Sequence, residues 1–523
     1  MTNANQPQEK PHHHFDGATP PSAAWHEQRW VIFLLLLLLY PLGVVLLIRH
    51  PRAARWRKAA GVVVMAPAFG LVALLALKPL WDFEGGMRSL RDFSLDFGRL
   101  TRPSALEKHR RAQRGSAPYV LQIAPEEAKL SWPDFRGPRR DGVYDAFDLQ
   151  LDWKACPPRE LWRQPIGGGY ASFVVGGGRA YTIEQRRDKE AVTCYELATG
   201  RELWVQEYEA SFEETLGGDG PRATPTLAGE RVYSLGAEGH LYCLEAADGR
   251  VVWKRNILQE FKQENLSWGL ACSPLVIDGK VLVTNSGKAD PSVLAYDAAT
   301  GDPVWNARAG LQAYSSLAVV TLAGRRQVLN LAAAALNGLD PASGEILWSH
   351  PWDTSMGINC SQPLEVGGDR IFLSSGYGKG SAVIKIEAAN GKLQAREIWS
   401  NTRMKNKFNS SVVSGGFAYG LDEGVLCCVE LETGERPWKG GKYGYGSVVL
   451  AQGHLIVMSD DGRLALVEAT PAEHREKGSM RVFNDRTWNN FALVGGRLLA
   501  RNHVEMALLD LRATSQAPIS AAR

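Results

Sequence analysis

A ten-residue phrase recurs along the chain, and its spacing constrains the fold more than any other feature. After one leading residue it reads Asp or Glu, two variable residues, a small polar residue, Gly, three variable residues and Trp. The copies are Tyr195–Trp204, Leu244–Trp253, Tyr296–Trp305, Leu339–Trp348 and Val429–Trp438, with a stretched copy at Ile386–Trp399. Their glycines are 49, 52, 43, 47 and 43 residues apart. Such a period indicates propeller blades or helical repeats.

The segments between the copies favour strands. Runs of β-branched and aromatic residues such as Arg231–Leu235 and His240–Glu245 are bounded by Gly, Asp and Asn clusters, and long segments of period 3.6 are not found. Each repeat therefore fits four antiparallel strands. In the second complete repeat we predict an inner strand at Thr224–Leu227 and an outer strand at Arg250–Arg255, after a turn at Asp248-Gly249. The Trp then lies on the outer strand, where it can cover the seam to the next sheet.

The phrase resembles the tryptophan-docking motif of the pyrroloquinoline-quinone (PQQ) repeat family. The resemblance covers roughly Ser131–Arg512. It implies an all-β propeller in which each sheet covers the next. The same motif builds quinoprotein dehydrogenases and non-enzymatic scaffold propellers, so the repeats indicate the fold and say little about chemistry.

Both ends of the repeat region contribute to one blade. A seventh set of strands without the tryptophan follows in Ser447–Asp485, and Phe491–Arg512 supplies three more strands. Leu161–Ile166 is a lone outer-strand pattern ahead of the first complete blade. Pairing it with the last three strands would complete an eighth blade and remove exposed sheet edges. We predict an eight-bladed propeller over residues 161–512, with seven blades as the alternative.

Charge and cysteine content narrow the function classes. The net charge of +3 and the absence of a basic run within the repeats argue against nucleic acid as a partner. The 7 cysteines do not form a disulfide framework. Cys194, Cys243 and Cys428 each lie six residues before a repeat glycine, and we interpret them as small apolar core residues.

The amino-terminal part reads as a membrane anchor. After a polar tail of residues 1–29, predicted to be disordered like residues 513–523, two apolar runs at Val31–Ile48 and Ala59–Leu80 predict a transmembrane helical hairpin over residues 30–81. The basic loop between them favours a cytoplasmic turn. The propeller would then face the periplasm or exterior from the inner (cytoplasmic) membrane. A cleaved signal peptide, and a single span with a cytoplasmic propeller, are the alternatives.

A linker and a leading segment join this anchor to the propeller. We assign residues 82–130 to the linker, in which Glu107–Arg114 reads as a solvated charge run. Residues 131–160 lead into the propeller. Their Trp132–Gly142 stretch resembles a Trp–x–x–Phe–Arg–Gly segment common to one bacterial branch of the family. We expect it to pack on the propeller rim or channel mouth, with a ligand role for Arg136 or Arg140 as the alternative.

Candidate ligand-binding residues come from the segments that lead into the inner strands. Ser, Thr and Gly in these segments are expected to be there mostly because they are small, since eight strands crowd at the axis. Larger side chains are more informative, because aromatic and polar groups that converge on a concavity make a ligand site. These residues, expected to ring one face, are Arg222, Trp268, Tyr314, Asn359, Lys405, Asn406, Tyr445 and Trp488.

The resemblance leaves PQQ and calcium as cofactors to be weighed. For an enzyme of this family, the resemblance implies a calcium ion held by carboxylate and amide oxygens, an Asp that acts as general base, and a disulfide between adjacent cysteines. Asn359 and Asn406 are candidate amide ligands, but no dependable Asp or Glu partner is found, and Cys427-Cys428 lies in a third strand rather than a channel loop. We predict no cofactor and no metal site.

Two functions remain. We favour a membrane-anchored, non-catalytic binding or assembly scaffold outside the cytoplasm, with a protein partner or small ligand at the propeller face. It resembles the outer-membrane-assembly propellers of the family, although those carry a lipid anchor. The alternative is a PQQ-dependent oxidoreductase of the alcohol or sugar dehydrogenase type that passes electrons to the membrane.

Overall fold

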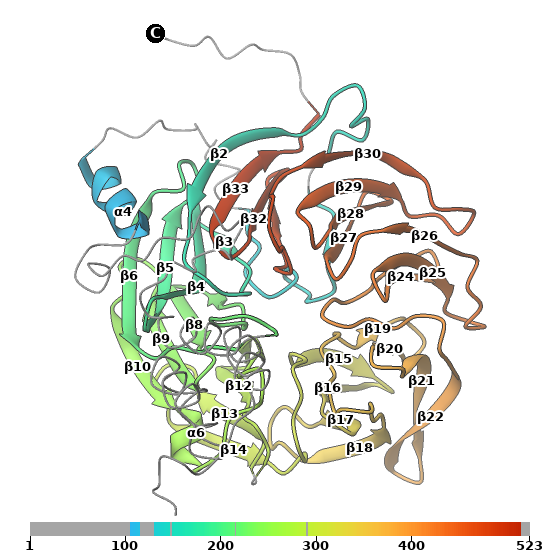
Figure 1. Ribbon diagram of the computed structural model, residues 1–523. Helices are drawn as coiled ribbons and strands as arrows, with labels where there is room; N and C mark the ends of the chain where they lie inside the picture. Colours follow the sequence, from blue (N-terminus) through green and yellow to red (C-terminus); the bar gives the residue numbers. More distant parts are fainter. Residues whose placement is uncertain (1–104, 116–129, 147–148, 215, 289–290, 514–523) are drawn as a thin grey trace, which may run out of the picture. The chain divides into compact units, whose positions relative to one another are not determined.

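Eight β-sheets stand around a central axis in the computed structural model, which describes residues 105–115, 130–146, 149–214, 216–288 and 291–513 (Figure 1). The predicted all-β, eight-bladed propeller is therefore confirmed. Each of blades 1 to 7 takes four consecutive strands in antiparallel order, and blade 8 combines strands from both ends of the repeat region. Among the described residues, two short helices lie outside the sheets, α4 (Ala105–Gly115) and α6 (Ile257–Glu260).

The strands of the first four blades follow the chain without interruption. Blade 1 contains β3 (Val174–Gly176), β4 (Arg179–Arg186), β5 (Lys189–Glu196) and β6 (Glu202–Glu209). Blade 2 contains β7 (Thr226–Ala228), β8 (Arg231–Leu235), β9 (His240–Glu245) and β10 (Val251–Asn256). Blade 3 contains β11 (Leu275–Ile277), β12 (Lys280–Thr284), β13 (Val293–Asp297) and β14 (Pro303–Ala307). Blade 4 contains β15 (Ala318–Leu322), β16 (Arg325–Leu331), β17 (Ala335–Leu339) and β18 (Ile346–Pro351).

The remaining blades complete the ring. Blade 5 contains β19 (Leu364–Glu365), β20 (Arg370–Ser375), β21 (Gly380–Ala389) and β22 (Lys392–Asn401). Blade 6 contains β23 (Val412–Ser414), β24 (Phe417–Asp422), β25 (Val425–Glu430) and β26 (Trp438–Lys442). Blade 7 contains β27 (Ser447–Ala451), β28 (His454–Met458), β29 (Arg463–Glu468) and β30 (Glu476–Arg481), with β1 (Val143–Tyr144) parallel to β27 as a fifth strand. Blade 8 contains β31 (Ala492–Val494), β32 (Arg497–Arg501), β33 (Glu505–Asp510) and β2 (Arg159–Pro165).

Blade 8 closes the ring as predicted. Strand β2 pairs antiparallel with β33, with Trp162 opposite Leu508 and Arg163 opposite Ala507. Figure 1 shows β2 lying beside β33, although more than 300 residues of chain separate them. Because β2 is the outermost strand of this sheet, the start of the repeat region covers an edge that the last strand would otherwise expose.

Each repeat tryptophan except Trp348 packs on the turn of the following blade. The Trp204 ring lies over Gly249, and its Nε1 donates a hydrogen bond to the Ala246 carbonyl (3.0 Å). The same arrangement joins Trp162 to Gly200, Trp253 to Gly301, Trp305 to Gly344 and Trp399 to Gly434. Trp348 is different, because its Nε1 donates to Gln327 within its own blade. At Gly391, the turn glycine of the stretched copy, an added Cβ would meet nothing within 4 Å.

Hydroxyl groups around the axis bond one blade to the next. The bonds are Ser172 N–H to Thr224 Oγ1 (3.0 Å), Thr224 N–H to Ser273 Oγ (3.0 Å), Ser273 N–H to Ser316 Oγ (2.9 Å) and Gln362 N–H to Ser410 Oγ (2.9 Å). The expectation of a mostly steric role for these small residues was therefore incomplete, because their hydroxyl oxygens satisfy buried backbone donors of the neighbouring blade.

The leading segment plugs the axis, in agreement with its predicted structural role. Strand β1 continues the sheet of blade 7 inward from β27. The buried Arg140 donates to the carbonyls of Leu317 (2.7 Å) and Ser273 (3.3 Å), and the buried Arg136 donates to the Ser411 carbonyl (2.6 Å). These arginines therefore tie blades 3, 4 and 6 to one short loop.

Helix α4 corrects one expectation about the linker. The Glu107–Arg114 run was predicted to be solvated, and Lys108 and Arg111 are exposed, but Arg110 is only 4% exposed. Arg110 donates to the Pro165 carbonyl (2.7 Å) and to the Tyr195 hydroxyl (3.2 Å). The helix therefore packs across the seam between blades 8 and 1.

The three repeat cysteines Cys194, Cys243 and Cys428 are buried and unpaired, as predicted. Within the described residues, no helix is both long and apolar enough to cross a membrane. The two predicted spans, Val31–Ile48 and Ala59–Leu80, lie outside the described residues and stay predictions.

Candidate functional site: an aromatic pocket on the propeller axis

Loops from seven of the eight blades meet around a cavity of about 250 Å³ on the axis. These loops lead from the outer strand of one blade to the inner strand of the next, and antiparallel strands bring all such connections to the same end of the ring, where the β20–β21 turn adds Tyr377. We call this cavity the channel pocket. Its lining residues are Phe135, Tyr170, Leu216, Gly217, Arg222, Trp268, Ala271, Ser273, Tyr314, Ser316, Ile358, Cys360, Tyr377, Phe408, Trp488 and Asn490.

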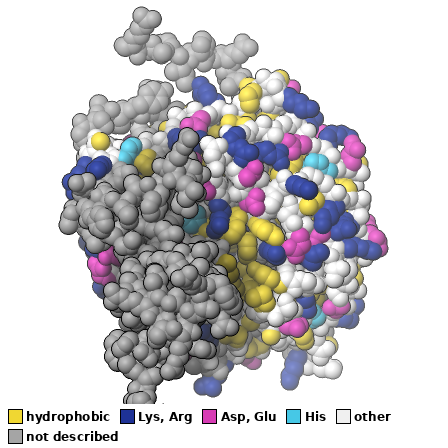
Figure 2. Space-filling view, in the orientation of Figure 1, with side chains coloured by type: hydrophobic (Ala, Val, Ile, Leu, Met, Phe, Trp, Pro, Cys, Tyr) yellow, Lys and Arg dark blue, Asp and Glu magenta, His cyan; other side chains and the backbone are white. Residues whose placement is uncertain are grey.

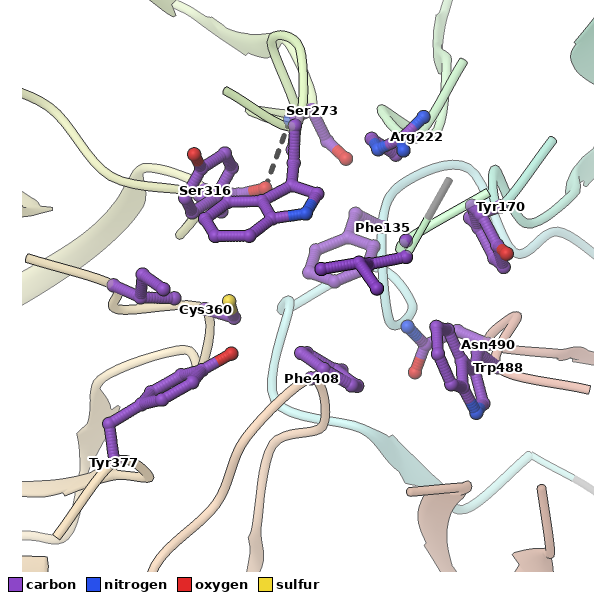
Figure 3. A pocket seen from close by; sticks show the side chains of 16 residues that line it. Phe135, Tyr170, Arg222, Ser273, Ser316, Cys360, Tyr377, Phe408, Trp488 and Asn490 are labelled. Carbon is purple, nitrogen blue, oxygen red and sulfur yellow. Dashed lines mark hydrogen bonds between the residues drawn. The ribbon is translucent and has the colours of Figure 1, made fainter. Parts of the chain in front are cut away.

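Aromatic rings form most of the wall. Tyr170 stacks on Trp488 with ring centroids 5.7 Å apart, and Trp488 contacts Phe408 at 5.0 Å. Trp268 meets Tyr314 edge to face at 5.7 Å. Figure 3 shows Tyr170, Arg222 and Trp488 on one side, Tyr377 and Cys360 on another, and Phe135 of the leading segment in the middle.

The leading segment and the hydroxyl groups that bond one blade to the next position the base of the pocket. Ser273 and Ser316 belong to both the pocket lining and the blade-to-blade hydrogen bonds, one of which is drawn in Figure 3. Arg140 holds the carbonyls next to them. The polar groups at the base are therefore committed to the fold, which leaves an apolar surface facing the cavity.

The titratable groups of the pocket are shifted by burial. Burial raises the pKa of Tyr170 above its usual value, and raises that of Tyr314 to about 12. Burial also raises the pKa of the Cys360 thiol to about 12 and lowers that of Arg222. The phenols and the thiol therefore stay neutral near pH 7, and Arg222 carries the charge among the lining side chains.

Four of the side chains predicted to ring this face line the pocket: Arg222, Trp268, Tyr314 and Trp488. Tyr445 lies behind the wall, with its ring 5.4 Å from Phe408 and its hydroxyl accepting from Lys407 (3.0 Å). Lys405 pairs with Asp422 at 3.1 Å.

The two amides are turned into the blades. Asn359 accepts a hydrogen bond from Ser375 (2.6 Å) and donates to the Ala332 carbonyl (2.8 Å). Asn406 accepts from Ser374 (3.2 Å) and donates to Ser411 (2.9 Å). Both side chains are fully buried, so the structure does not bring them to the pocket.

Sequence reasoning missed several lining residues. Tyr170, Tyr377 and Phe408 are the aromatic ones, and Phe135 belongs to the Trp132–Gly142 stretch, which was expected only to pack on the propeller rim or channel mouth. Tyr170 and Phe408 come directly before the small or polar residues that lead into the inner strands β3 and β23. Tyr314 and Trp488 have the same position ahead of β15 and β31. That shared offset is the signal that could have identified them.

The pocket does not fit a calcium-bound PQQ. No Asp or Glu is among its lining residues, and the amide oxygens of Asn359 and Asn406 already accept hydrogen bonds within the blades. In the part of the chain that the structure describes, no three His, Cys, Asp or Glu side chains gather as a metal site. Cys427 and Cys428 are unpaired and buried in β25, away from the channel loops.

Eight radial sheets, tryptophans docked on the turns of the next blade, and closure by both ends of the repeat region define a PQQ-like β-propeller. Within it, the family profile described as outer membrane protein assembly factor BamB matches residues 188–440. BamB of Bordetella pertussis (strain Tohama I) is 24% identical over 313 residues, which are 57% of this chain and 72% of that protein.

Enzymes of the family are also similar over shorter or more divergent stretches. The quinohemoprotein alcohol dehydrogenase ADH IIB of Pseudomonas putida is 29% identical over 119 residues, 22% of this chain and 17% of that enzyme. Among solved structures, BamB of Moraxella catarrhalis has a TM-score of 0.50 at 16% identity, covering 69% of this chain and 99% of that one. The alcohol dehydrogenase ADHIIG of Pseudomonas putida HK5 has a TM-score of 0.54 at 12% identity, covering 78% and 84%. At these identities the structures establish the fold alone.

Proposed function

We propose that this propeller is a non-catalytic binding or assembly scaffold that binds a protein partner at the channel pocket. In this proposal the amino-terminal segment anchors the chain in the inner (cytoplasmic) membrane, and the propeller faces the periplasm or exterior. The similarity to BamB, an outer membrane protein assembly factor by name, supports the scaffold role.

The observation that carries the proposal is an exposed apolar rim around the pocket. Leu216 is 74% exposed, Met356 62%, Leu311 48% and Phe408 37%, and all four lie on loops that join one blade to the next. Figure 2 shows hydrophobic side chains gathered near the centre of the ring, with Lys and Arg side chains around them. A rim of this kind next to a concavity is typical of a protein interface, since soluble surfaces rarely gather large apolar side chains.

Site-specific photo-cross-linking in native membranes tests the role of this rim. A photoreactive amino acid at Leu216 or Phe408 should give one discrete adduct of the same mass. The matched controls are Leu203 and Val304, which are also exposed but lie on the outer strands β6 and β14. Equal adducts from the rim and the outer strands, or none from the rim, would contradict the proposal.

A second measurement separates the scaffold from a quinoprotein. The purified protein is mixed with PQQ and Ca²⁺, and quinone absorbance and alcohol- or sugar-dependent dye reduction are followed. We expect no turnover, because the pocket offers no carboxylate to hold calcium. Clear turnover would overturn the scaffold proposal.

The proposed orientation has its own test. Thr300 is exposed on a turn of blade 3, so a Thr300→Cys variant offers a thiol to a membrane-impermeant maleimide added to spheroplasts. Labelling of the variant, but not of the unaltered chain, is expected from a periplasmic propeller. Labelling only after lysis would favour the single-span topology with a cytoplasmic propeller.

A further inference from the structure

We propose that the partner segment bound in the channel pocket carries an aromatic side chain flanked by acidic residues. This inference rests on the proposed function and names the chemistry of the partner. It is carried by two stacked rings in the wall of the pocket and by the two arginines that lie against them.

Arg222, Tyr170 and Trp488 line the pocket, and the exposed Arg486 lies against Trp488. The Arg222 guanidinium lies 5.4 Å from the Tyr170 ring centroid, and the Arg486 guanidinium lies 4.5 Å from that of Trp488. Tyr170 and Trp488 stack on each other, and Arg486 also donates to the Tyr170 hydroxyl (3.5 Å). Each cation therefore lies against one ring of a stacked aromatic pair that lines the cavity.

The ion pairs found among the described residues do not include Arg222 or Arg486, although the Glu214 and Asp219 carboxylates are near enough to act on the pKa of Arg222. The Arg222 guanidinium donates to the carbonyl of Gly218 (2.6 Å) and rests on Phe212. This contrasts with two other cations near the pocket, since Lys407 pairs with Glu423 (3.1 Å) and Lys379 with Asp353 (3.4 Å).

The nearby carboxylates are held by backbone groups. Glu214 accepts from the Gly217 N–H, Asp219 accepts from the Glu214 N–H (3.0 Å), and Asp485 accepts from the Arg486 N–H (2.8 Å). They shape the loops rather than neutralise the guanidinium groups at contact distance. Burial lowers the pKa of Arg222, and the nearby Glu214 and Asp219 carboxylates offset only part of that effect. An incoming carboxylate would offset more of it.

The cavity sets the rest of the partner's chemistry. Its volume of about 250 Å³ suits a single large side chain, and its aromatic walls favour a flat ring. A cationic ligand is disfavoured by Arg222 and Arg486. In a segment that has an aromatic residue between acidic neighbours, the ring would fill the apolar cavity and the carboxylates would pair with both arginines.

Short capped peptides test this chemistry on the full chain in detergent. The probes are Gly-Asp-Phe-Asp-Gly, the matched Gly-Lys-Phe-Lys-Gly and the ring-deleted Gly-Asp-Ala-Asp-Gly. Binding is followed by tryptophan fluorescence, because Trp268 and Trp488 line the pocket. We expect the Asp-Phe-Asp peptide to bind at least about tenfold more tightly than either of the others, and more weakly as salt is raised.

Variants tie the effect to the wall. Arg486→Gln should weaken binding of the Asp-Phe-Asp peptide about tenfold and leave the Lys peptide unchanged or improved. Arg396→Gln is the control, because Arg396 is exposed on the outer strand β22 and pairs with Glu387. Equal affinity for the Asp and Lys peptides, no effect of Arg486→Gln, or no binding by any peptide would overturn the inference.

The outcomes separate this inference from the proposed function. If the rim cross-links to one partner but the peptides show no preference for acidic residues, the scaffold stands and the partner chemistry is wrong. If the rim gives no specific adduct and no peptide binds, both fall.

Discussion

A repeat tryptophan such as Trp204 can dock on the next blade because a glycine lies beneath its ring. At Gly249 the backbone has φ of +77°, and an added Cβ would lie 2.5 Å from the Trp204 ring. The glycine therefore does two things: it adopts a turn that other residues resist, and it leaves room for an indole from the preceding blade. The indole Nε1 then bonds to the Ala246 carbonyl, so docking covers a seam without leaving a buried donor unpaired.

This pairing predicts different costs at two glycines with the same turn geometry. Gly249→Ala should lower the free energy of unfolding by about 2–4 kcal/mol, because it adds both left-handed strain and a collision with Trp204. Gly391→Ala, with φ of +75° but no neighbour within 4 Å, should cost only about 1 kcal/mol. Urea unfolding of both variants checks this. Equal losses would mean that the indole contributes little.

Glu190 links blades 1 and 2 and should make stability depend on pH. It is 0% exposed, accepts from the Tyr208 hydroxyl (2.7 Å) and the Ala237 N–H (2.9 Å), and burial raises its pKa from 4.5 to about 7. Because the folded-state pKa lies above the unfolded-state value, the unfolded chain loses this proton first. The Glu190 contribution to the free energy of unfolding therefore falls as pH rises from about 4.5 to 7, and is constant above that.

A neutral amide removes this dependence. Relative to the unaltered chain, Glu190→Gln should become progressively more stable between pH 5 and pH 8, by up to about 3 kcal/mol. Urea unfolding at several pH values measures the difference between the two proteins, in which the titration of all other groups cancels. A difference that stays constant over this range would contradict the assignment.

At the scale of elements, the sequence predicts strands much better than it predicts the contacts around them. The strands Arg231–Leu235 and His240–Glu245 were predicted with their observed bounds, because alternating apolar residues and Gly turns are local signals. Helix α4 was missed as a packed element, because its charged run gives no local hint that Arg110 meets Pro165 and Tyr195. The bonds between blades, such as Ser172 to Thr224, were missed for the same reason.

Helix α4 should stabilise the seam that closes the ring. Arg110→Ala removes three hydrogen bonds and a 3.6 Å ion pair with Glu202, and we expect it to lower the free energy of unfolding by about 1–3 kcal/mol. Glu202 keeps its ion pair with Arg186, so the substitution does not leave the Glu202 carboxylate unpaired. Arg111→Ala is the control, since Arg111 is exposed on the same helix. Hydrogen exchange should show faster opening of β2 in the Arg110 variant only.

At the scale of the whole molecule, the pocket illustrates the limit of reading a site from sequence. Arg222, Trp268, Tyr314 and Trp488 were found because the blades are equivalent and the axis is where their inner strands meet. Asn359 and Asn406 occupy similar positions in the chain but turn into the blades toward Ser375 and Ser374. The direction of a side chain depends on its partners in space, and the repeat does not encode those partners.

Because both ends of the repeat region close the ring, truncation is expected to change folding. A chain that ends after Asn490 loses β31, β32 and β33, so β2 has no partner strand and blades 1 and 7 each lose a covered face. We expect this chain to unfold at lower urea with reduced cooperativity and to self-associate through the open edges. A chain that ends after Ala513 keeps every described strand and should match the full chain. Size-exclusion chromatography and urea unfolding distinguish the two, and a monomeric, cooperative chain ending at Asn490 would mean that the ring does not need its eighth blade.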